Sequence, residues 1–224
     1  MEIGPIWRSM MRNKTGAILI ALQIAVTMAI MVNAVSIMQE KSSMMSRPSG
    51  IDEHNIFSIA SVGFAEDFNE RVTIEEDLAA LRSMPGVVNA IQSNSIPLSG
   101  GGWSMGLQTE PGAEIEGTSV AVYFIDEHGL DTYDLELIAG ENFSETDVGW
   151  RERSQTDWPD RTIITRAMAE TLYPDNWESA IGKTVYINDE QPLTITGIIK
   201  QMQAAWNGWD GVERVMLVPQ HTLF

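Results

Sequence analysis

The apolar segment at residues 17–38 constrains the fold of this chain more than any other feature. It contains no charged residue, and its polar members are Gln23, Thr27, Asn33 and Ser36. As an α-helix it would measure about 33 Å, which is enough to cross the hydrocarbon core of a bilayer. The sequence therefore predicts a membrane-spanning helix at residues 17–38.

The charges on either side of this segment predict its orientation. Arg8, Arg12 and Lys14 precede it, whereas the chain beyond residue 40 is strongly acidic. Because positive charges stay on the cytoplasmic side, we expect a cytoplasmic N-terminus at residues 1–16 and an extracytoplasmic body. A basic leader before an apolar run is also typical of a cleaved signal peptide, here with cleavage after Ala34, and that alternative exports the same body.

The body carries most of the net charge. The chain has a formal charge of −17, and its first fourteen residues contribute three basic side chains against Glu2, which leaves −19 for the remainder. A body this acidic repels phosphate backbones, so we expect no nucleic-acid partner. There is no cysteine, which excludes disulfides, thiolate metal sites and cysteine nucleophiles.

Small side chains along the predicted span indicate that it packs against other helices. Ala17, Ala21, Ala25 and Ala29 recur at every fourth position and form a strip that would let a neighbouring helix approach closely. No second apolar run of membrane length follows. We therefore expect the partner helices to come from a further C-terminal part or from another subunit.

Two other polar or apolar patterns accompany the span. Gln23 and Thr27 lie one turn apart on a different side and would prefer a polar partner to lipid. Before the span, apolar residues recur at helical spacing, which predicts an amphipathic helix on the cytoplasmic leaflet. Its members are Ile3, Ile6, Trp7, Met10 and Met11.

After a polar linker at residues 39–50, the body at residues 51–224 reads as a mixture of strands and helices. Strands are predicted at 54–62, 87–91, 103–109, 118–125, 135–139, 161–165, 184–187, 193–200 and 212–218. Helices are predicted after a capping box at Thr73–Glu76, at 126–131 and at 166–173, with a long loop at 141–160. Without regular βαβ alternation, this pattern favours an α+β body in one or two lobes.

The motifs that suggest chemistry do not complete a site. Gly182, Lys183 and Thr184 resemble the end of a phosphate loop, but Trp177 stands where that loop requires its first glycine. The three histidines, His54, His128 and His221, lack paired ligand spacing, and the acids Glu141, Glu145 and Asp147 lack the glycine and spacing of a calcium loop. We expect no catalytic residue, no metal and no cofactor.

Several tryptophans fall in or beside predicted loops. They are Trp150, Trp158, Trp206 and Trp209. Exposed aromatic side chains often anchor interfaces. The alternative is that they fill the core of a second lobe, and we favour this interpretation.

The order of several segments resembles the MacB and FtsX-like permeases of bacterial ABC transporters. The similar segments are WRSMMRNK at 7–14, LRSMPGV at 81–87, IAGENF at 138–143 with Asp147, IITRAMAETLY at 163–173, AIGKT at 180–184 and ITGII at 195–199. Each motif is short, but together they are distributed over most of the chain, from residue 7 to residue 199, in a consistent order.

The resemblance implies an inner-membrane protein with a MacB-like periplasmic core domain and no catalysis of its own. It also implies an ABC ATPase subunit, a second permease subunit and a periplasmic adaptor as partners, and export or mechanotransmission as the function. This chain departs from the family in reaching Phe224 without three C-terminal spans. We therefore expect a fragment, and the alternatives are a single-span binding or sensor module and an anchored enzyme.

Overall fold

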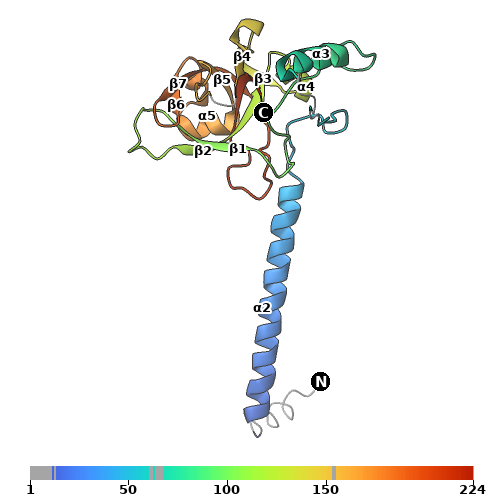
Figure 1. Cartoon of the computed structure of the whole chain (residues 1–224). Coiled ribbons are helices and arrows are strands. Elements are labelled where there is room, and N and C mark those ends of the chain that lie inside the picture. Colours follow the sequence, from blue (N-terminus) through green and yellow to red (C-terminus); the bar gives the residue numbers. More distant parts are fainter. Residues whose placement is uncertain (1–11, 13, 61–62, 64–67, 153–154, 224) are drawn as a thin grey trace. The chain divides into compact units, whose positions relative to one another are not determined.

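The computed structural model describes residues 12, 14–60, 63, 68–152 and 155–223, and it divides the chain into two compact units (Figure 1). The first unit is Met1–Arg47 and the second is Pro48–Phe224. The amphipathic helix predicted from Ile3 to Met11 lies outside the described residues.

The first unit contains one long helix, α2, at Lys14–Met45. It is long and apolar enough to cross a membrane. The helix continues through residues 39–45, which the sequence indicates as linker, because Gln39, Glu40 and Lys41 are good helix formers. Its thirty-two residues correspond to about 48 Å, so the apolar segment is the central part of a longer rod.

The second unit is built on one connected sheet. In the described residues its strands are β1 Trp103–Gln108, β2 Thr118–Ile125, β3 Leu137–Gly140, β4 Gly149–Arg151, β5 Arg161–Thr165, β6 Thr184–Ile187, β7 Gln191–Ile199 and β8 Val215–Thr222. The order is β2-β1-β6-β7-β5-β8-β4, with β3 beside β7. Because β2 also pairs with β8 in parallel, the path from β2 through β1, β6, β7 and β5 to β8 closes into a ring.

Alternating side chains divide the apolar residues of the sheet between two buried clusters. On β2, Val122 and Phe124 enter one cluster, while Ala121 and Tyr123 enter the other. The first cluster also contains Met168 from helix α5, and the second contains residues of helix α4. Strand β2 is therefore covered on both faces, which explains its continuous apolar run.

Three α-helices and two short 3-10 helices complete the described body. They are α3 Glu70–Arg82, α4 Gly129–Tyr133, α5 Arg166–Leu172, η1 Glu145–Asp147 and η2 Trp177–Ala180. Helix α5 begins where β5 ends, because the hydroxyl of Thr165 accepts a hydrogen bond from the Met168 backbone N–H. The α+β prediction is confirmed, and the sheet is not divided between two lobes.

Most elements predicted after residue 100 are confirmed with small shifts at their ends. Two corrections apply to this part. The short helix predicted at 126–131 lies at Gly129–Tyr133, since the Asp126 carboxylate first bonds the His128 backbone N–H. The loop predicted at 141–160 contains η1 and β4, and β4 is only three residues long, too short to show a periodic pattern.

The elements predicted between residues 54 and 91 agree less well with the structure. The capping box is wrong: α3 begins at Glu70, and Asn69 caps it by accepting from the Val72 backbone N–H at 3.2 Å. Thr73 lies inside the helix and donates its hydroxyl to the Asn69 carbonyl. The strand predicted at 54–62 is absent from residues 54–60, and the one predicted at 87–91 is absent.

The segment after α3 contacts the sheet through side-chain amides instead of forming a strand. Asn94 donates to the Val122 carbonyl at 3.1 Å and accepts from the Phe124 backbone N–H at 2.8 Å. Gln92 donates to the Thr222 carbonyl at 2.6 Å and accepts from the backbone N–H of the same residue at 3.1 Å. These two amides satisfy backbone groups of β2 and β8 that a neighbouring strand would otherwise bond.

Candidate functional site

The body begins with an anchored segment three residues after the last residue of α2. The Pro48 carbonyl accepts hydrogen bonds from the side-chain amides of Gln201 and Gln203, and the Ser49 carbonyl accepts from the Gln203 backbone N–H. Gly50 has a φ of +85°, and a Cβ at this position would lie 2.4 Å from the Gln201 carbonyl oxygen. Only glycine fits this close approach, so the chain is held to the segment after β7 from Pro48 onward.

The predicted packing strip lies within α2. Ala17 is half-buried and Ala21, Ala25 and Ala29 are exposed, and α2 contains no buried residue. Within the described part of this chain the strip is therefore open to another helix. The role of these alanines remains a prediction.

The two polar residues of the span differ in their need for a partner. The Thr27 hydroxyl donates to the Gln23 carbonyl at 2.9 Å, inside the same helix. Thr27 therefore needs no polar neighbour from another chain. The expectation of an external partner now applies to the Gln23 side-chain amide alone.

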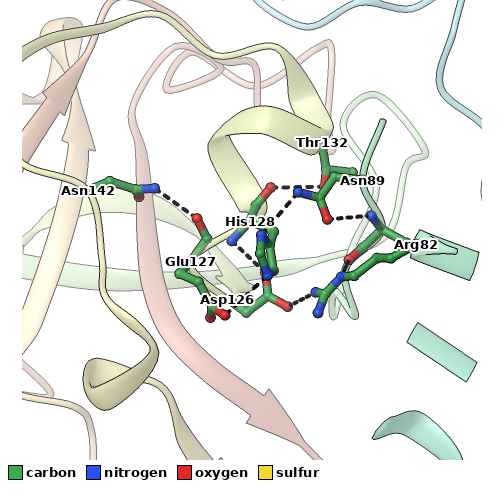
Figure 2. A network of polar contacts seen from close by, with 8 residues as sticks. Arg82, Asn89, Asp126, Glu127, His128, Thr132 and Asn142 are labelled. Atoms are coloured by element: carbon green, nitrogen blue, oxygen red, sulfur yellow. Dashed lines mark hydrogen bonds and ion pairs between the residues drawn. The ribbon is translucent and has the colours of Figure 1, made fainter. Parts of the chain in front are cut away.

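A buried ion pair attaches α3 to the sheet (Figure 2). Asp126 directly follows β2 and is 2% exposed, and its carboxylate pairs with the Arg82 guanidinium at the last residue of α3. Arg82 also donates through Nε to the Ala90 carbonyl at 2.9 Å. A buried carboxylate is tolerated when it is paired and hydrogen-bonded in this way.

The network continues from this pair into α4 and the segment after β3 (Figure 2). The His128 ring lies 3.0 Å from the Asn89 amide through Nδ1 and 3.2 Å from the Glu127 carboxylate through Nε2. Asn142 donates to the Glu127 carbonyl at 2.8 Å, and the Thr132 hydroxyl donates to the His128 carbonyl. Both ring nitrogens of His128 are engaged, so its role is structural.

A second contact of α3 uses an aromatic stack. The Arg71 guanidinium lies 4.8 Å from the Trp150 ring centroid, and Trp150 in turn stacks on His221 at 4.5 Å. Burial lowers the pKa of His221, while the negative charges of Asp126 and Glu127 oppose that shift. Helix α3 is thus fixed at both ends by cationic side chains.

Two of the acidic residues at the start of the loop predicted at 141–160 are paired with the first residue of β5. Arg161 contacts Glu141 and Asp147, each at 3.2 Å. Hydrogen bonds from the Ser144 hydroxyl and backbone N–H lower the pKa of Asp147. Among the described residues there is no group of three or more His, Asp or Glu side chains suited to a metal ion.

A profile of the MacB-like periplasmic core domain family matches residues 17–223, which include both α2 and the body. The chain belongs to this family. The extracellular domain of the noncanonic ABC-type transporter YknZ from Gram-positive bacteria is 24% identical, with a TM-score of 0.44 over 65% of this chain and 62% of that chain. The periplasmic region of MacB from Actinobacillus actinomycetemcomitans is 21% identical, with a TM-score of 0.40 over 65% and 54%.

This MacB-like chain therefore spans less than two thirds of the length of those two structures. No curated protein sequence matches it. Family membership and the apolar helix together describe a membrane-anchored protein with a MacB-like periplasmic core domain.

Within the MacB-like body, Gly182 is part of a turn and not of a nucleotide site. It has a φ of +76°, its N–H donates to the Ile195 carbonyl, and the exposed Lys183 precedes strand β6. The loop tryptophans pack: Trp158 lies against the cluster that contains Met168, and Trp206 and Trp209 lie against the other.

The sequence did not predict the residues whose polar contacts connect distant segments of the body. These are Arg82 with Asp126, the amides of Gln92 and Asn94, and the amides of Gln201 and Gln203. The one signal available was an aspartate placed directly after the apolar strand at 118–125. The amide contacts join residues 28 to 155 positions apart and have no periodic signature.

Proposed function

We propose that this chain is a non-catalytic permease component of a MacB-type ABC transporter. It would couple ATP hydrolysis by a separate ABC ATPase to export or to movement of its extracytoplasmic body. The observation that carries the proposal is the family match over residues 17–223, because it includes the apolar helix and the folded body together. The partners in this proposal are the ATPase, a second permease subunit and a periplasmic adaptor.

The proposed location is the bacterial inner membrane, with the N-terminus in the cytoplasm and the body in the periplasm. The basic residues Arg8, Arg12 and Lys14 before the span support this orientation. The acidic character of the remainder agrees with it, since acidic residues are tolerated on the outer side.

The anchored segment at Pro48–Gly50 supports a coupling role. Only Ser46 and Arg47 separate the end of α2 from the residue that Gln201 and Gln203 hold. Any coupling between the helix and the body would pass through this short covalent connection, which is much shorter than a flexible linker.

Orientation can be tested because the chain has no native cysteine. Glu190→Cys places one thiol in the exposed turn between β6 and β7. A membrane-impermeant maleimide should label it in intact cells to at least 80% of the level seen after lysis. Labelling only after lysis would place the body in the cytoplasm and remove the proposal.

Assembly can be tested at the alanine strip. Ala21→Leu with Ala25→Leu should reduce co-purification with the ATPase and with a tagged second permease copy at least tenfold, because added bulk separates the helix backbones. Val26→Leu with Ala34→Leu enlarges the opposite side of α2 and should change recovery less than twofold. If neither partner is recovered even with the unmodified chain, a single-span binding or sensor module becomes the better assignment.

A further inference from the structure

A polar cavity lies between the segment that contains β4 and the end of β8. Its volume is about 420 Å³, which is within the range of small-molecule sites. Its lining includes Asp147, Trp150, Asp157, Trp158, Asp160 and Gln220. We call it the β4 pocket, and no step of the permease proposal uses it.

Gln220 gives this pocket a buried polar group without a partner. The side chain is 4% exposed, it lines the pocket, and its Oε1 accepts no hydrogen bond within the described part of the chain. A buried carbonyl oxygen without a donor is costly, so Gln220 favours a bound group that supplies N–H donors.

The charged residues that line the pocket, within the described part of the chain, sum to a negative charge. Asp147, Asp157 and Asp160 contribute −3 and Arg161 contributes +1, which leaves −2. Arg161 is already occupied, because it contacts Asp147 and also Glu141 outside the pocket. In the described residues the carboxylates of Asp157 and Asp160 have no ion-pair or hydrogen-bond partner and are exposed.

The walls of the pocket are held in place by contacts of their own. The Gln155 side chain accepts a hydrogen bond from the Glu152 backbone N–H at 3.1 Å, and the Gln155 backbone carbonyl accepts one from Arg151 Nε at 3.0 Å. Trp150 stacks on His221, and Trp158 packs 5.9 Å from Phe124. The cavity is therefore formed before any ligand arrives, which reduces the ordering that binding requires.

We propose that the β4 pocket binds an organic cation through an ammonium or guanidinium group. The site offers unpaired acceptors, namely the carboxylates of Asp157 and Asp160 at its rim and the Gln220 oxygen at its buried side. A group with several N–H donors and a positive charge matches both features, since charge-assisted hydrogen bonds to carboxylates are the strong ones. The side chains of Trp150 and Trp158 also line the pocket and give the carbon chain of such a ligand an apolar surface.

Agmatine, which carries both a guanidinium and an ammonium group, is the first probe. Isothermal titration calorimetry with the full chain in detergent micelles at 150 mM NaCl should show saturable one-to-one binding, and neutral 1,4-butanediol should show none. Asp157→Asn with Asp160→Asn should raise the Kd about tenfold or more, because it removes both free carboxylates. The matched control, Asp175→Asn with Glu190→Gln, removes the same charge at exposed sites elsewhere and should change the Kd less than twofold.

Gln220→Leu tests the buried acceptor and should raise the Kd at least threefold. If this variant fails to fold, the exposed double variant still decides the question. Equal weakening in both double variants would mean general attraction to an acidic body and would overturn the proposal, as would the absence of saturable binding. A second arm with the peptide acetyl-Ala-Arg-Ala-amide identifies the source of the cation: tighter binding than agmatine assigns it to a protein side chain, and weaker binding assigns it to a free amine.

Discussion

Two regions of the same body are held together in different ways. Residues 103–222 form a sheet whose backbone groups bond from strand to strand over two apolar clusters. Residues 69–95 contribute two apolar side chains, the buried Leu78 of α3 and the partly buried Ile91 against the second cluster, and most of their other contacts are polar. They include the Arg82–Asp126 pair, the Arg71 guanidinium over the Trp150 ring and the amides of Gln92 and Asn94.

The difference predicts that the two regions respond differently to loss of a contact. A sheet with a closed pairing path and an apolar core unfolds as one cooperative unit. An element attached by a few polar groups can detach locally while the remainder stays folded. Helix α3 is therefore the part of the body that we expect to open first.

The largest effect is expected from breaking the buried ion pair. Asp126→Ala leaves the Arg82 guanidinium without its partner, and it should lower the free energy of unfolding by about 3 kcal/mol. Urea denaturation followed by tryptophan fluorescence measures this loss. The control Asp210→Ala removes a carboxylate that is 89% exposed and lies 3.7 Å from Arg214, and it should change stability by less than about 0.5 kcal/mol.

Hydrogen exchange in Asp126→Ala separates local from global opening. In this variant, the ratio of the exchange rate of the α3 amides to that of the β5 and β7 amides should be at least ten times the ratio in the unmodified chain. Equal acceleration in α3 and in the two strands would show that the regions open together, and the contrast between them would not hold.

A smaller effect is expected from the amide that replaces a strand. Asn94→Ala leaves the Val122 carbonyl and the Phe124 N–H without their partner, which should lower stability by about 1–2 kcal/mol. The amide proton of Phe124 should exchange faster by about tenfold. Asn55→Ala removes an exposed amide bonded to Asp52 and serves as the control; an unchanged Phe124 amide would mean that another group takes the place of Asn94.

The smallest expected effect is a pH dependence of the stability that comes from His221 in the aromatic stack. Burial lowers the pKa of His221 below its ordinary value of 6.5, so the unfolded chain binds this proton at a pH where the folded chain does not. The contribution of the neutral His221 ring to stability is therefore fully present above about pH 6.5, and it is lost as the pH drops toward the folded-state pKa. His221→Gln should flatten this part of the stability profile, and an identical slope in the variant would contradict the assignment to His221.

The sequence was informative where side chains repeat with a period. Strands β2, β5 and β6 were predicted with their observed bounds, because apolar residues bounded by turns identify a buried strand without knowledge of its neighbours. Most of the failures lie between residues 54 and 95. There the chain is shaped by single residues such as Asn69, which caps α3, and Asn94, whose partner is 28 to 30 positions away.

The amino-acid sequence by itself determined the membrane-length helix, the acidic α+β body and the resemblance to MacB-like permeases. These follow from composition and from local periodicity, which need no partner to be recognised. Only the tertiary structure decided the closure of the sheet through β2 and β8, the polar attachment of α3 and the formation of the β4 pocket. Each of these depends on groups distant in the chain that meet in space, and polar contacts of that kind leave no repeating pattern in the sequence.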